Sequence, residues 1–375
     1  MVIKAHSSLA LAHRKSQKTP SSPPTTDMNS NIESALELKQ ISNDMFISRT
    51  LWLPLGARGV FGGQIIGQSL VAASSTVHPD FHVHSMHSYF LLPGDSKKEV
   101  KYSVTRLRDG KSFTTRLVVA TQPFPANSAV SSNAENSAKS EKAREFANSS
   151  KSENSEKPPI APDKDVPIFA AMCSFQRPSP TPFVHQVKMP VVIPPENLKS
   201  THDILEDWLG VVPKKSPYHN LIRMRLQDPI PVEIRPVNPP NPQDYLNPQK
   251  RQPKQMIWIK AKGTVSPELD TAAFHNCIAA YCSDHYLLTS SLLAHGVTAI
   301  SSPNRLQMMA SLDHVLWFHA PFRADNWLLY EMASPWSAFG RGLAVGRIWS
   351  RDGTLLVSVG QEGVIRIGDT RGAKL

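Results

Sequence analysis

The amino-acid sequence repeats one pattern of residues in its two halves. Three positions recur at a constant offset of 228 residues, namely Phe90, Pro93 and Tyr102 on Phe318, Pro321 and Tyr330. Further along, Phe113 matches Phe339 at an offset of 226, and Gln176 in AAMCSFQ matches Gln361 in LLVSVGQ at an offset of 185. The drop from 226 to 185 predicts that the first copy carries 41 additional residues before its last strand. A repeated unit of roughly 130 residues is as large as a domain, so the sequence predicts two tandem domains rather than a solenoid.

Composition narrows the class of protein. The 375 residues suffice for about two domains with hydrophobic cores, although 32 prolines indicate that part of the chain lies outside them. The three cysteines, Cys173, Cys277 and Cys282, form no CxxC pair and indicate reduced thiols in an intracellular protein. A net charge of +10 suits an anionic partner such as a phosphate-bearing small molecule, but no basic cluster is interleaved with aromatic residues, which argues against nucleic acid. No apolar run reaches the ~18 residues that a membrane span needs.

The sequence divides into two domains, a connector and two tails. Residues 1–30 are rich in Ser, Thr, Pro and Lys and predict a disordered tail. Residues 123–165 have almost no large apolar side chains, so they cannot offset their ordering entropy and predict a disordered insertion. We expect a first domain over 31–178, a proline-rich connector over 179–228, a second domain over 229–367 and a flexible tail over 368–375.

Each domain is predicted to contain a strand, a long apolar helix and an antiparallel meander. The helices are expected within 58–77 and at about 271–294, with a shorter one near 202–210 in the connector. Strands are expected at 44–52, 83–92, 98–108, 113–121 and 170–176 in the first copy, and at 229–237, 255–263, 309–319, 327–335, 340–351 and 354–365 in the second. A helix wrapped by an antiparallel sheet places the chain in the α+β class.

The second helix carries a carboxylate on its expected apolar stripe. Cys277, Tyr281, Asp284 and Leu288 follow one another at i, i+4, i+7 and i+11, so they share one face of a helix. A carboxylate that faces a core is costly unless a partner hydrogen-bonds it. The corresponding stretch of the first copy, 57–79, contains no Asp or Glu, so the fold does not require an acid there. We interpret Asp284 as a functional carboxylate, with a surface or capping acid as the alternative.

A serine lies in the predicted strand ASLDHVLWFH. Strict alternation would place Ser311, Asp313, Val315 and Trp317 on one face and His314 on the other. His314 would then point away from Ser311, and the chain contains no G-x-S-x-G elbow, so a serine-hydrolase triad of Ser311, Asp313 and His314 is excluded. Ser311 is either a hydrogen-bonding partner of the functional acid or an ordinary strand serine.

Gln361 ends a strand on the face of Leu355, Val357 and Val359, and its match to Gln176 leaves a structural role open. Together with Asp284 and Ser311, it gives the chain an acid and two uncharged polar groups. Such a set can orient and deprotonate a water molecule without a metal or a covalent intermediate. It suits the hydrolysis of a thioester, whose thiolate leaves easily and whose carbonyl a backbone N–H or helix start can polarise.

Several segments resemble the acyl-CoA thioesterase II family. They are VFGGQIIGQSLVAA, HVHSMHSYFLLPGD, AYCSDHYLL, ASLDHVLWFHAPFRADNWLLYE and GQEGVIR. The resemblance covers about residues 45–122, 167–178 and 229–365, and the 123–165 insertion and a loop at 238–253 depart from it without interrupting these motifs. It implies a double hot-dog fold, in which each of two copies is a helix wrapped by an antiparallel sheet. It also implies hydrolysis of fatty acyl-CoA to free fatty acid and CoA.

The resemblance implies a water-orienting set made of an Asp, a Thr or Ser, and a Gln. These roles carry over onto Asp284 as general base or water anchor and onto Ser311 and Gln361 as the groups that position the water. The helix start at Gly62 and Gly63 is expected to shape the acyl site. We expect no cofactor and no metal, and an acyl-CoA substrate. The oligomeric state stays open, with pairing of sheet edges between copies of the chain as one alternative.

The residues Ala373, Lys374 and Leu375 resemble the C-terminal peroxisomal address. We therefore expect recognition by the peroxisomal import receptor and a location in the peroxisomal matrix, while the basic N-terminus leaves a second location open. Two other functions remain alternatives. One is an enoyl-CoA hydratase or dehydratase, which would need an Asp/His pair facing one cavity, for which His285 and His314 lie poorly. The other is a non-catalytic acyl-CoA-binding protein.

Overall fold

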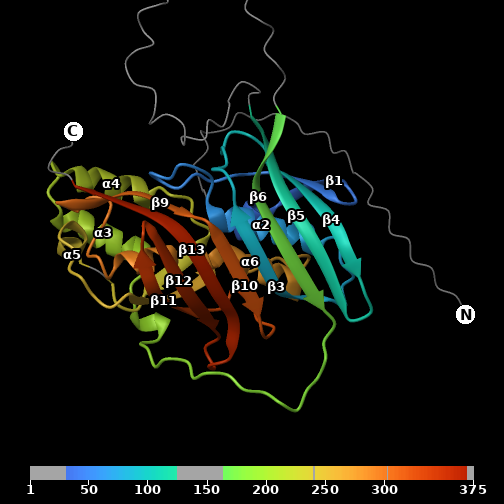
Figure 1. Cartoon of the computed structure of the whole chain (residues 1–375). Helices are drawn as coiled ribbons and strands as arrows, with labels where there is room; N and C mark the ends of the chain where they lie inside the picture. Colours follow the sequence, from blue (N-terminus) through green and yellow to red (C-terminus); the bar gives the residue numbers. More distant parts are fainter. Residues whose placement is uncertain (1–30, 125–163, 240, 302, 370–375) are drawn as a thin grey trace, which may run out of the picture.

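The computed structural model describes residues 31–124, 164–239, 241–301 and 303–369. The expected tail over 1–30, residues 125–163 of the expected insertion and the Ala373-Lys374-Leu375 sequence lie outside them. In the described part of the chain, antiparallel strands form one 13-stranded sheet that curves around two central helices, α2 (Gly62–Ser74) and α6 (Ala272–Cys282) (Figure 1). No helix among these residues is both long enough and apolar enough to cross a membrane.

The strands of the first half are β1 (Leu38–Ser42), β2 (Met45–Ser48), β3 (His82–Phe90), β4 (Lys101–Asp109), β5 (Phe113–Phe124) and β6 (Lys164–Gln176). Those of the second half are β7 (Val232–Pro236), β8 (Lys254–Ala261), β9 (Asn304–Ser311), β10 (Asp313–Phe318), β11 (Leu328–Ala338), β12 (Arg341–Trp349) and β13 (Leu355–Asp369). The remaining helices are α1 (Ile32–Leu36), α3 (Thr201–Val211), α4 (Pro217–Leu226) and α5 (Pro242–Leu246), with 3-10 turns at Pro195–Asn197 and Leu288–Leu292.

The two halves join edge to edge. The sheet runs β2-β4-β5-β6-β3 in the first half and continues as β10-β13-β12-β11-β8 in the second, so β3 pairs with β10 at the seam. Each half is one long helix covered by an antiparallel meander. The double hot-dog fold expected from the sequence is therefore confirmed.

The two central helices pack closely because α2 carries glycines on the face that meets α6. A Cβ atom on Gly63 would lie 2.4 Å from the Tyr281 carbonyl oxygen, and one on Gly67 would lie 3.1 Å from the Cys277 carbonyl oxygen. Side chains at these positions would push the helices apart. The buried residues of both halves form one continuous core around the pair.

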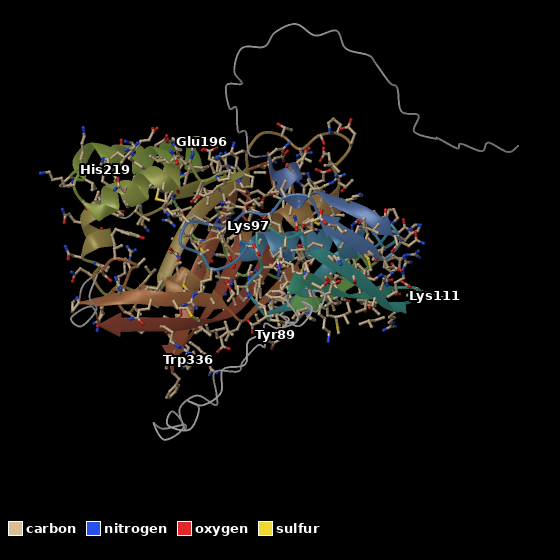
Figure 2. All side chains as sticks on the ribbon, turned by 90° about the horizontal axis from the view of Figure 1, so that it is seen from above. Tyr89, Lys97, Lys111, Glu196, His219 and Trp336 are labelled. Carbon is tan, nitrogen blue, oxygen red and sulfur yellow. The ribbon has the colours of Figure 1, made fainter. Side chains whose placement is uncertain are left out.

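The connector forms a separate small layer. Ile204, Trp208, Tyr218 and Ile222 of α3 and α4 make their own buried cluster. Figure 2 shows His219 of α4 at one end of the molecule and Lys111, in the β4–β5 turn, at the other. The helix expected near 202–210 is confirmed, whereas α4 and α5 were not predicted from the sequence.

Strand pairing corrects the register of the sequence repeat. In the first half, Phe90 and Ala120 lie opposite the same residue of β6, and in the second half their counterparts lie opposite the same residue of β13. The matching triplets are Phe90, Ala120 and Phe169 in the first half and Phe318, Ile348 and Val357 in the second. The offset is 228 for the first two residues and 188 for the third.

At an offset of 188, Gln361 corresponds to Cys173 rather than to Gln176. The expected match between Gln176 and Gln361 was therefore wrong. The expected match between Phe113 and Phe339 was also wrong, because Phe339 lies in the β11–β12 turn, where it has a positive φ. The first copy has 40 additional residues, the difference between 228 and 188, rather than 41. Hence the glutamine belongs to the second half alone.

Several expected boundaries also differ. Helix α6 ends at Cys282, twelve residues before the expected position 294. The expected strand 309–319 is two strands, β9 and β10, separated by Leu312. The ends of the expected 123–165 insertion belong to β5 and β6, where Pro123 pairs with Asp165, and β13 continues to Asp369 instead of ending near 365.

Candidate active site

The carboxylate of Asp284 is held between the two halves. Asp284 follows Ser283, the C-cap of α6, and Tyr286 then adopts a φ of 63°, which turns the chain away from the helix axis. The predicted stripe had placed Asp284 within a continuous helix, and this was wrong. Its Oδ2 accepts a hydrogen bond of 2.9 Å from the backbone N–H of Gly63, in the first turn of α2. The positive end of the α2 dipole therefore faces the carboxylate.

Gln361 links the acid to the serine. Its Nε2 donates one hydrogen bond of 2.8 Å to Asp284 Oδ1 and another of 2.7 Å to Ser311 Oγ. The structure thus brings together Asp284, Ser311 and Gln361, the three residues that the sequence singled out. Because both amide hydrogens already have protein acceptors, Gln361 fixes the relative positions of the acid and the hydroxyl.

Burial sets the proton affinity of the acid. Desolvation raises the pKa of Asp284 above its ordinary value, and the hydrogen bonds from Gln361 and from the Gly63 N–H only partly oppose this effect. The carboxyl group is not sealed off, because Asp284 borders a cavity and remains partly exposed. A carboxylate with a raised pKa that faces a cavity is a better proton acceptor than an ordinary aspartate.

The cavity has a volume of about 940 Å³ and is lined by both halves of the chain and by the connector. Gly62, Phe90 and Phe169 come from the first half, and Asp284 and Ser311 from the second. Gln361 lies behind the wall, 1% exposed. A volume of this size is at the upper end of the range for small-molecule sites.

The glycine pair expected at the acyl site has a specific role beside the acid. A Cβ atom on Gly62 would lie 2.7 Å from Asp284 Oδ2 and 3.0 Å from the Phe90 ring, so any side chain there would displace the carboxylate. The Gly63 N–H is already bonded to Asp284. That N–H holds the acid, and is not available to polarise a substrate carbonyl.

A β-bulge changes the direction of the side chains around Ser311. Ser311 lies opposite Gly363 and Val315 lies opposite Gly360, so four steps on β9–β10 match only three on β13. The extra residue at Leu312 resets the alternation, as β-bulges do. Ser311 and His314 therefore both point inward, and the expectation that His314 points to the opposite face was wrong.

The inward direction of His314 does not create a serine-hydrolase triad. Its Nε2 lies 2.8 Å from the Oγ of Ser283, whereas Ser311 bonds to Gln361. The carboxylate of Asp313 accepts a hydrogen bond from the Glu362 N–H. Sequence reasoning missed the Ser283–His314 contact, because the bulge that produces it has no signature in the sequence.

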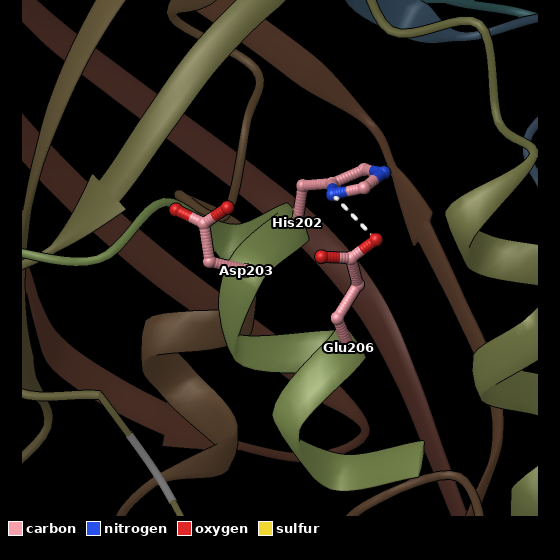
Figure 3. A group of neighbouring side chains, drawn as sticks. All are labelled: His202, Asp203 and Glu206. Atoms are coloured by element: carbon pink, nitrogen blue, oxygen red, sulfur yellow. Dashed lines mark ion pairs between the residues drawn. The ribbon is translucent and has the colours of Figure 1, made fainter. Parts of the chain in front are cut away.

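One group of potential metal ligands lies outside the cavity. His202, Asp203 and Glu206 of α3 lie close together on the surface, and Figure 3 shows the His202–Glu206 ion pair. Asp203 forms a capping box with Ser200, and its carboxylate is held by the Ser200 N–H. Helix capping and an ordinary i,i+4 pair account for this cluster.

Two family models match the chain. The model described as acyl-CoA thioesterase matches residues 231–364, and the model described as acyl-CoA thioesterase N-terminal domain matches residues 49–134. They fall on the second and first halves of the double hot-dog, respectively.

Individual relatives match over nearly the whole chain. Human acyl-coenzyme A thioesterase 8 is 38% identical over 336 residues, which cover 90% of this chain and 89% of the relative. The peroxisomal acyl-coenzyme A thioester hydrolase 1 of Saccharomyces cerevisiae is 26% identical, covering 91% and 96% of the two chains. The crystal structure of acyl-CoA thioesterase II TesB2 from Mycobacterium marinum superposes with a TM-score of 0.59 at 30% identity and covers 90% and 98%. The chain belongs to the acyl-CoA thioesterase family of thioester hydrolases.

Proposed function

We propose that this enzyme hydrolyses fatty acyl-CoA to free fatty acid and CoA by means of a water molecule that Asp284 and Ser311 orient, while Gln361 holds these two side chains in position. The observation that carries the proposal is that Asp284 and Ser311 line one cavity and that Gln361, directly behind its wall, is hydrogen-bonded to both. The names of the relatives, all acyl-CoA thioesterases or thioester hydrolases, support the substrate class.

In this reaction, Asp284 accepts a proton from water while the water oxygen attacks the thioester carbonyl carbon. The C–S bond then breaks, the thiolate leaves as CoA, and the proton held by Asp284 returns to the products. Ser311 Oγ accepts its hydrogen bond from Gln361, so its own proton is directed elsewhere and can be donated to the water or to the carbonyl oxygen. The reaction requires only water and the thioester.

The cavity has the charge and the shape for an acyl-CoA. Arg58, Arg225 and Arg251 line it, against two acids, Asp244 and Asp284, which suits a ligand with phosphate groups. Apolar side chains line it as well, including Ile65, Phe90, Phe169, Leu292 and Val297. An acyl chain would lie against these apolar groups, as is usual for apolar ligands.

The proposal is tested by replacing Asp284 with Asn and measuring thiol release from palmitoyl-CoA. We expect turnover to fall by roughly 10²–10⁴-fold, the usual contribution of a general base. A fold check by circular dichroism and a Ser311→Ala variant accompany it. Unchanged hydrolysis by folded D284N would refute the assignment of the base. Wild-type enzyme that binds palmitoyl-CoA without releasing thiol would instead favour a binding protein, and hydration of an enoyl-CoA a hydratase.

We further propose that the enzyme works in the peroxisome. The name of the yeast relative supports this location, and the Ala373-Lys374-Leu375 sequence is the expected recognition element for the import receptor. A fluorescent protein fused to the N-terminus should co-localise with a peroxisomal marker and become cytosolic when residues 373–375 are deleted. Unchanged localisation of the truncated protein would contradict the role of this sequence.

A further inference from the structure

His314 and Gln361 lie directly opposite each other on neighbouring strands. Val315 pairs with Gly360 and Leu316 with Val359, so the same antiparallel register places His314 against Gln361. Both side chains point inward and each is 1% exposed. Residues paired across antiparallel strands have Cβ atoms about 4.5–5.5 Å apart, close enough for their side chains to interact.

Each of these two side chains has one buried polar atom left over. His314 Nε2 is taken by Ser283 Oγ, and Gln361 Nε2 is taken by Asp284 and Ser311. The other two atoms, His314 Nδ1 and Gln361 Oε1, are buried and have no hydrogen-bond partner among the described residues. A buried polar atom without a hydrogen-bond partner lowers the stability of the fold by about 1–3 kcal/mol. A hydrogen bond between His314 Nδ1 and Gln361 Oε1 would satisfy both atoms.

The orientation of the glutamine amide decides which atom must donate. The carboxylate of Asp284 can only accept, so the end of the amide that faces it is the NH₂ group and the opposite end is the oxygen. A neutral imidazole carries one proton. With that proton on Nδ1, His314 donates to Gln361 Oε1, and its Nε2 accepts a hydrogen bond from the Ser283 hydroxyl.

The other tautomer is less favourable. With the proton on Nε2, His314 would donate to Ser283 Oγ, whose hydroxyl would bond the Ala280 carbonyl 2.8 Å away. The lone pair of Nδ1 would then face the lone pairs of Gln361 Oε1. This arrangement leaves two buried acceptors, Nδ1 and Oε1, without a donor, whereas the tautomer protonated on Nδ1 only takes the Ser283 hydroxyl proton away from the Ala280 carbonyl.

We propose that His314 is a positioning residue that fixes the Gln361 amide through a hydrogen bond from Nδ1–H to Oε1. Gln361 then presents its two N–H groups to the base and to the hydroxyl. The proposal rests on the proposed function, because the residue it assigns holds Gln361, which in turn holds Asp284 and Ser311. Burial also lowers the pKa of His314 to about 3, so the imidazole is neutral at the pH where the enzyme works.

The first half of the molecule shows that the fold does not require this polar pair. At the offsets of 228 and 188, His314 corresponds to Met86 and Gln361 to Cys173, and Met86 lies opposite Cys173 in the same register. Both residues are fully buried. In the first half, which has no acid to orient, an apolar pair therefore occupies the position that His314 and Gln361 occupy in the second half.

Substitution of His314 by Asn or by Gln distinguishes the role of Nδ1 from that of Nε2. In His314→Asn the side-chain amide occupies the place of Nδ1 and can still donate to Gln361. In His314→Gln it reaches the place of Nε2 and keeps the contact with Ser283, but leaves no donor for Gln361. We expect kcat of H314Q to fall by roughly 10–100-fold with KM nearly unchanged, because misplacement of a catalytic group by about 1 Å can cost 10²-fold. H314N should keep most of the wild-type kcat.

The tautomer itself provides a readout that does not depend on activity. Long-range ¹H–¹⁵N correlation spectra of the wild-type enzyme should show a neutral imidazole protonated on Nδ1 that does not titrate down to pH 4. The spectrum of the His285→Phe variant lacks the signals of His285, the other described histidine whose pKa burial lowers to about 3, so the remaining signals of this kind are assigned to His314. A signal protonated on Nε2, or H314Q with the same kcat as H314N, would overturn the proposal. Full turnover by D284N would instead refute the proposed function and leave the tautomer result standing.

Discussion

The backbone N–H of Gly63 donates a 2.9 Å hydrogen bond to Oδ2 of Asp284, joining residues 221 positions apart. The helix start of one half thus holds the acid of the other half. The active site is therefore formed at the interface between the two repeats, and changes at Gly62 or Gly63 of the first half should affect turnover as much as changes near the acid.

Substitution of Gly62 tests this interface. In Gly62→Ala the new Cβ would lie 2.7 Å from Asp284 Oδ2, so the carboxylate has to move and kcat should fall by about 10²-fold. Gly210, near the end of helix α3, is the matched control, because a Cβ there meets nothing within 4 Å. G210A should keep full activity and raise the free energy of unfolding by roughly 0.5–1 kcal/mol. Thiol-release kinetics and denaturant titrations measure both effects, and normal activity of G62A would contradict the geometry.

The pH dependence of turnover follows from the raised pKa of Asp284. Asp284 must be ionised to accept a proton, so kcat should fall as the pH decreases through a pKa above the ordinary 3.8 of an aspartate. The hydrogen bond from Gln361 lowers this pKa, so Gln361→Leu should move the acidic limb of the profile to higher pH as well as reduce kcat. Ser311→Ala should reduce kcat without moving the limb. A limb that stays in place in Q361L would mean that another group controls it.

A buried arginine occupies the part of the first half that corresponds to the catalytic region. Arg116 corresponds to Ala344 at the offset of 228, and its guanidinium donates to the side chain and the carbonyl of Thr76, the residue after the C-cap of α2. Thr76 holds the place relative to α2 that Asp284 holds relative to α6. A threonine held by a structural arginine therefore takes the place of the acid in this half.

Removal of Arg116 should therefore affect stability and not chemistry. Arg116→Leu should lower the free energy of unfolding by roughly 2 kcal/mol or more, because it leaves buried acceptors without donors. The kcat of the folded fraction should stay within about threefold, because Asp284, Ser311 and Gln361 are untouched. Arg106→Leu, which removes an exposed pair with Asp44, is the control and should cost less than about 1 kcal/mol. A large loss of kcat in folded R116L would show that Arg116 also acts on the catalytic residues.

Acid should destabilise the fold through its buried histidines. Burial lowers the pKa of His285 from 6.5 to about 3, and the Phe61 ring packs against the imidazole in a tilted arrangement, 4.6 Å between centroids. Between these pH values the unfolded chain binds a proton that the folded chain does not, so the free energy of unfolding falls as the pH decreases from about 6.5 towards 3. His285→Phe should make this dependence shallower in denaturant titrations at several pH values. An equally steep dependence in H285F would assign the acid sensitivity to other groups.

The sequence was sufficient to predict the existence of the repeat, the fold class, and Asp284, Ser311 and Gln361 as a group of polar residues. Asp284 was identified because the second predicted helix contains a carboxylate and the first contains none. Its position beyond the end of α6, at the turn that Tyr286 makes, was not predicted. Periodicity overextended that helix because Leu288 and its neighbours form a 3-10 turn with the same apolar character. Helical spacing does not distinguish a helix from a compact turn that is also buried.

Register was the part that the sequence could not supply. Short apolar strands match one another nearly as well after a shift of a few residues, so the terminal glutamines were aligned with each other. Only backbone pairing shows that Gln361 corresponds to Cys173. In the same way, alternation along β9 and β10 gave the wrong direction for His314, because the bulge at Leu312 adds one residue to one strand only.

The seam between β3 and β10 has a consequence for how the chain can be divided. Each half on its own would expose the backbone donors and acceptors of one strand edge, together with an empty place where the helix of the other half belongs. Two separately expressed halves would regain turnover only after they reassembled. Thiol release from the thioester by a mixture of the two fragments would therefore measure the association of the halves directly.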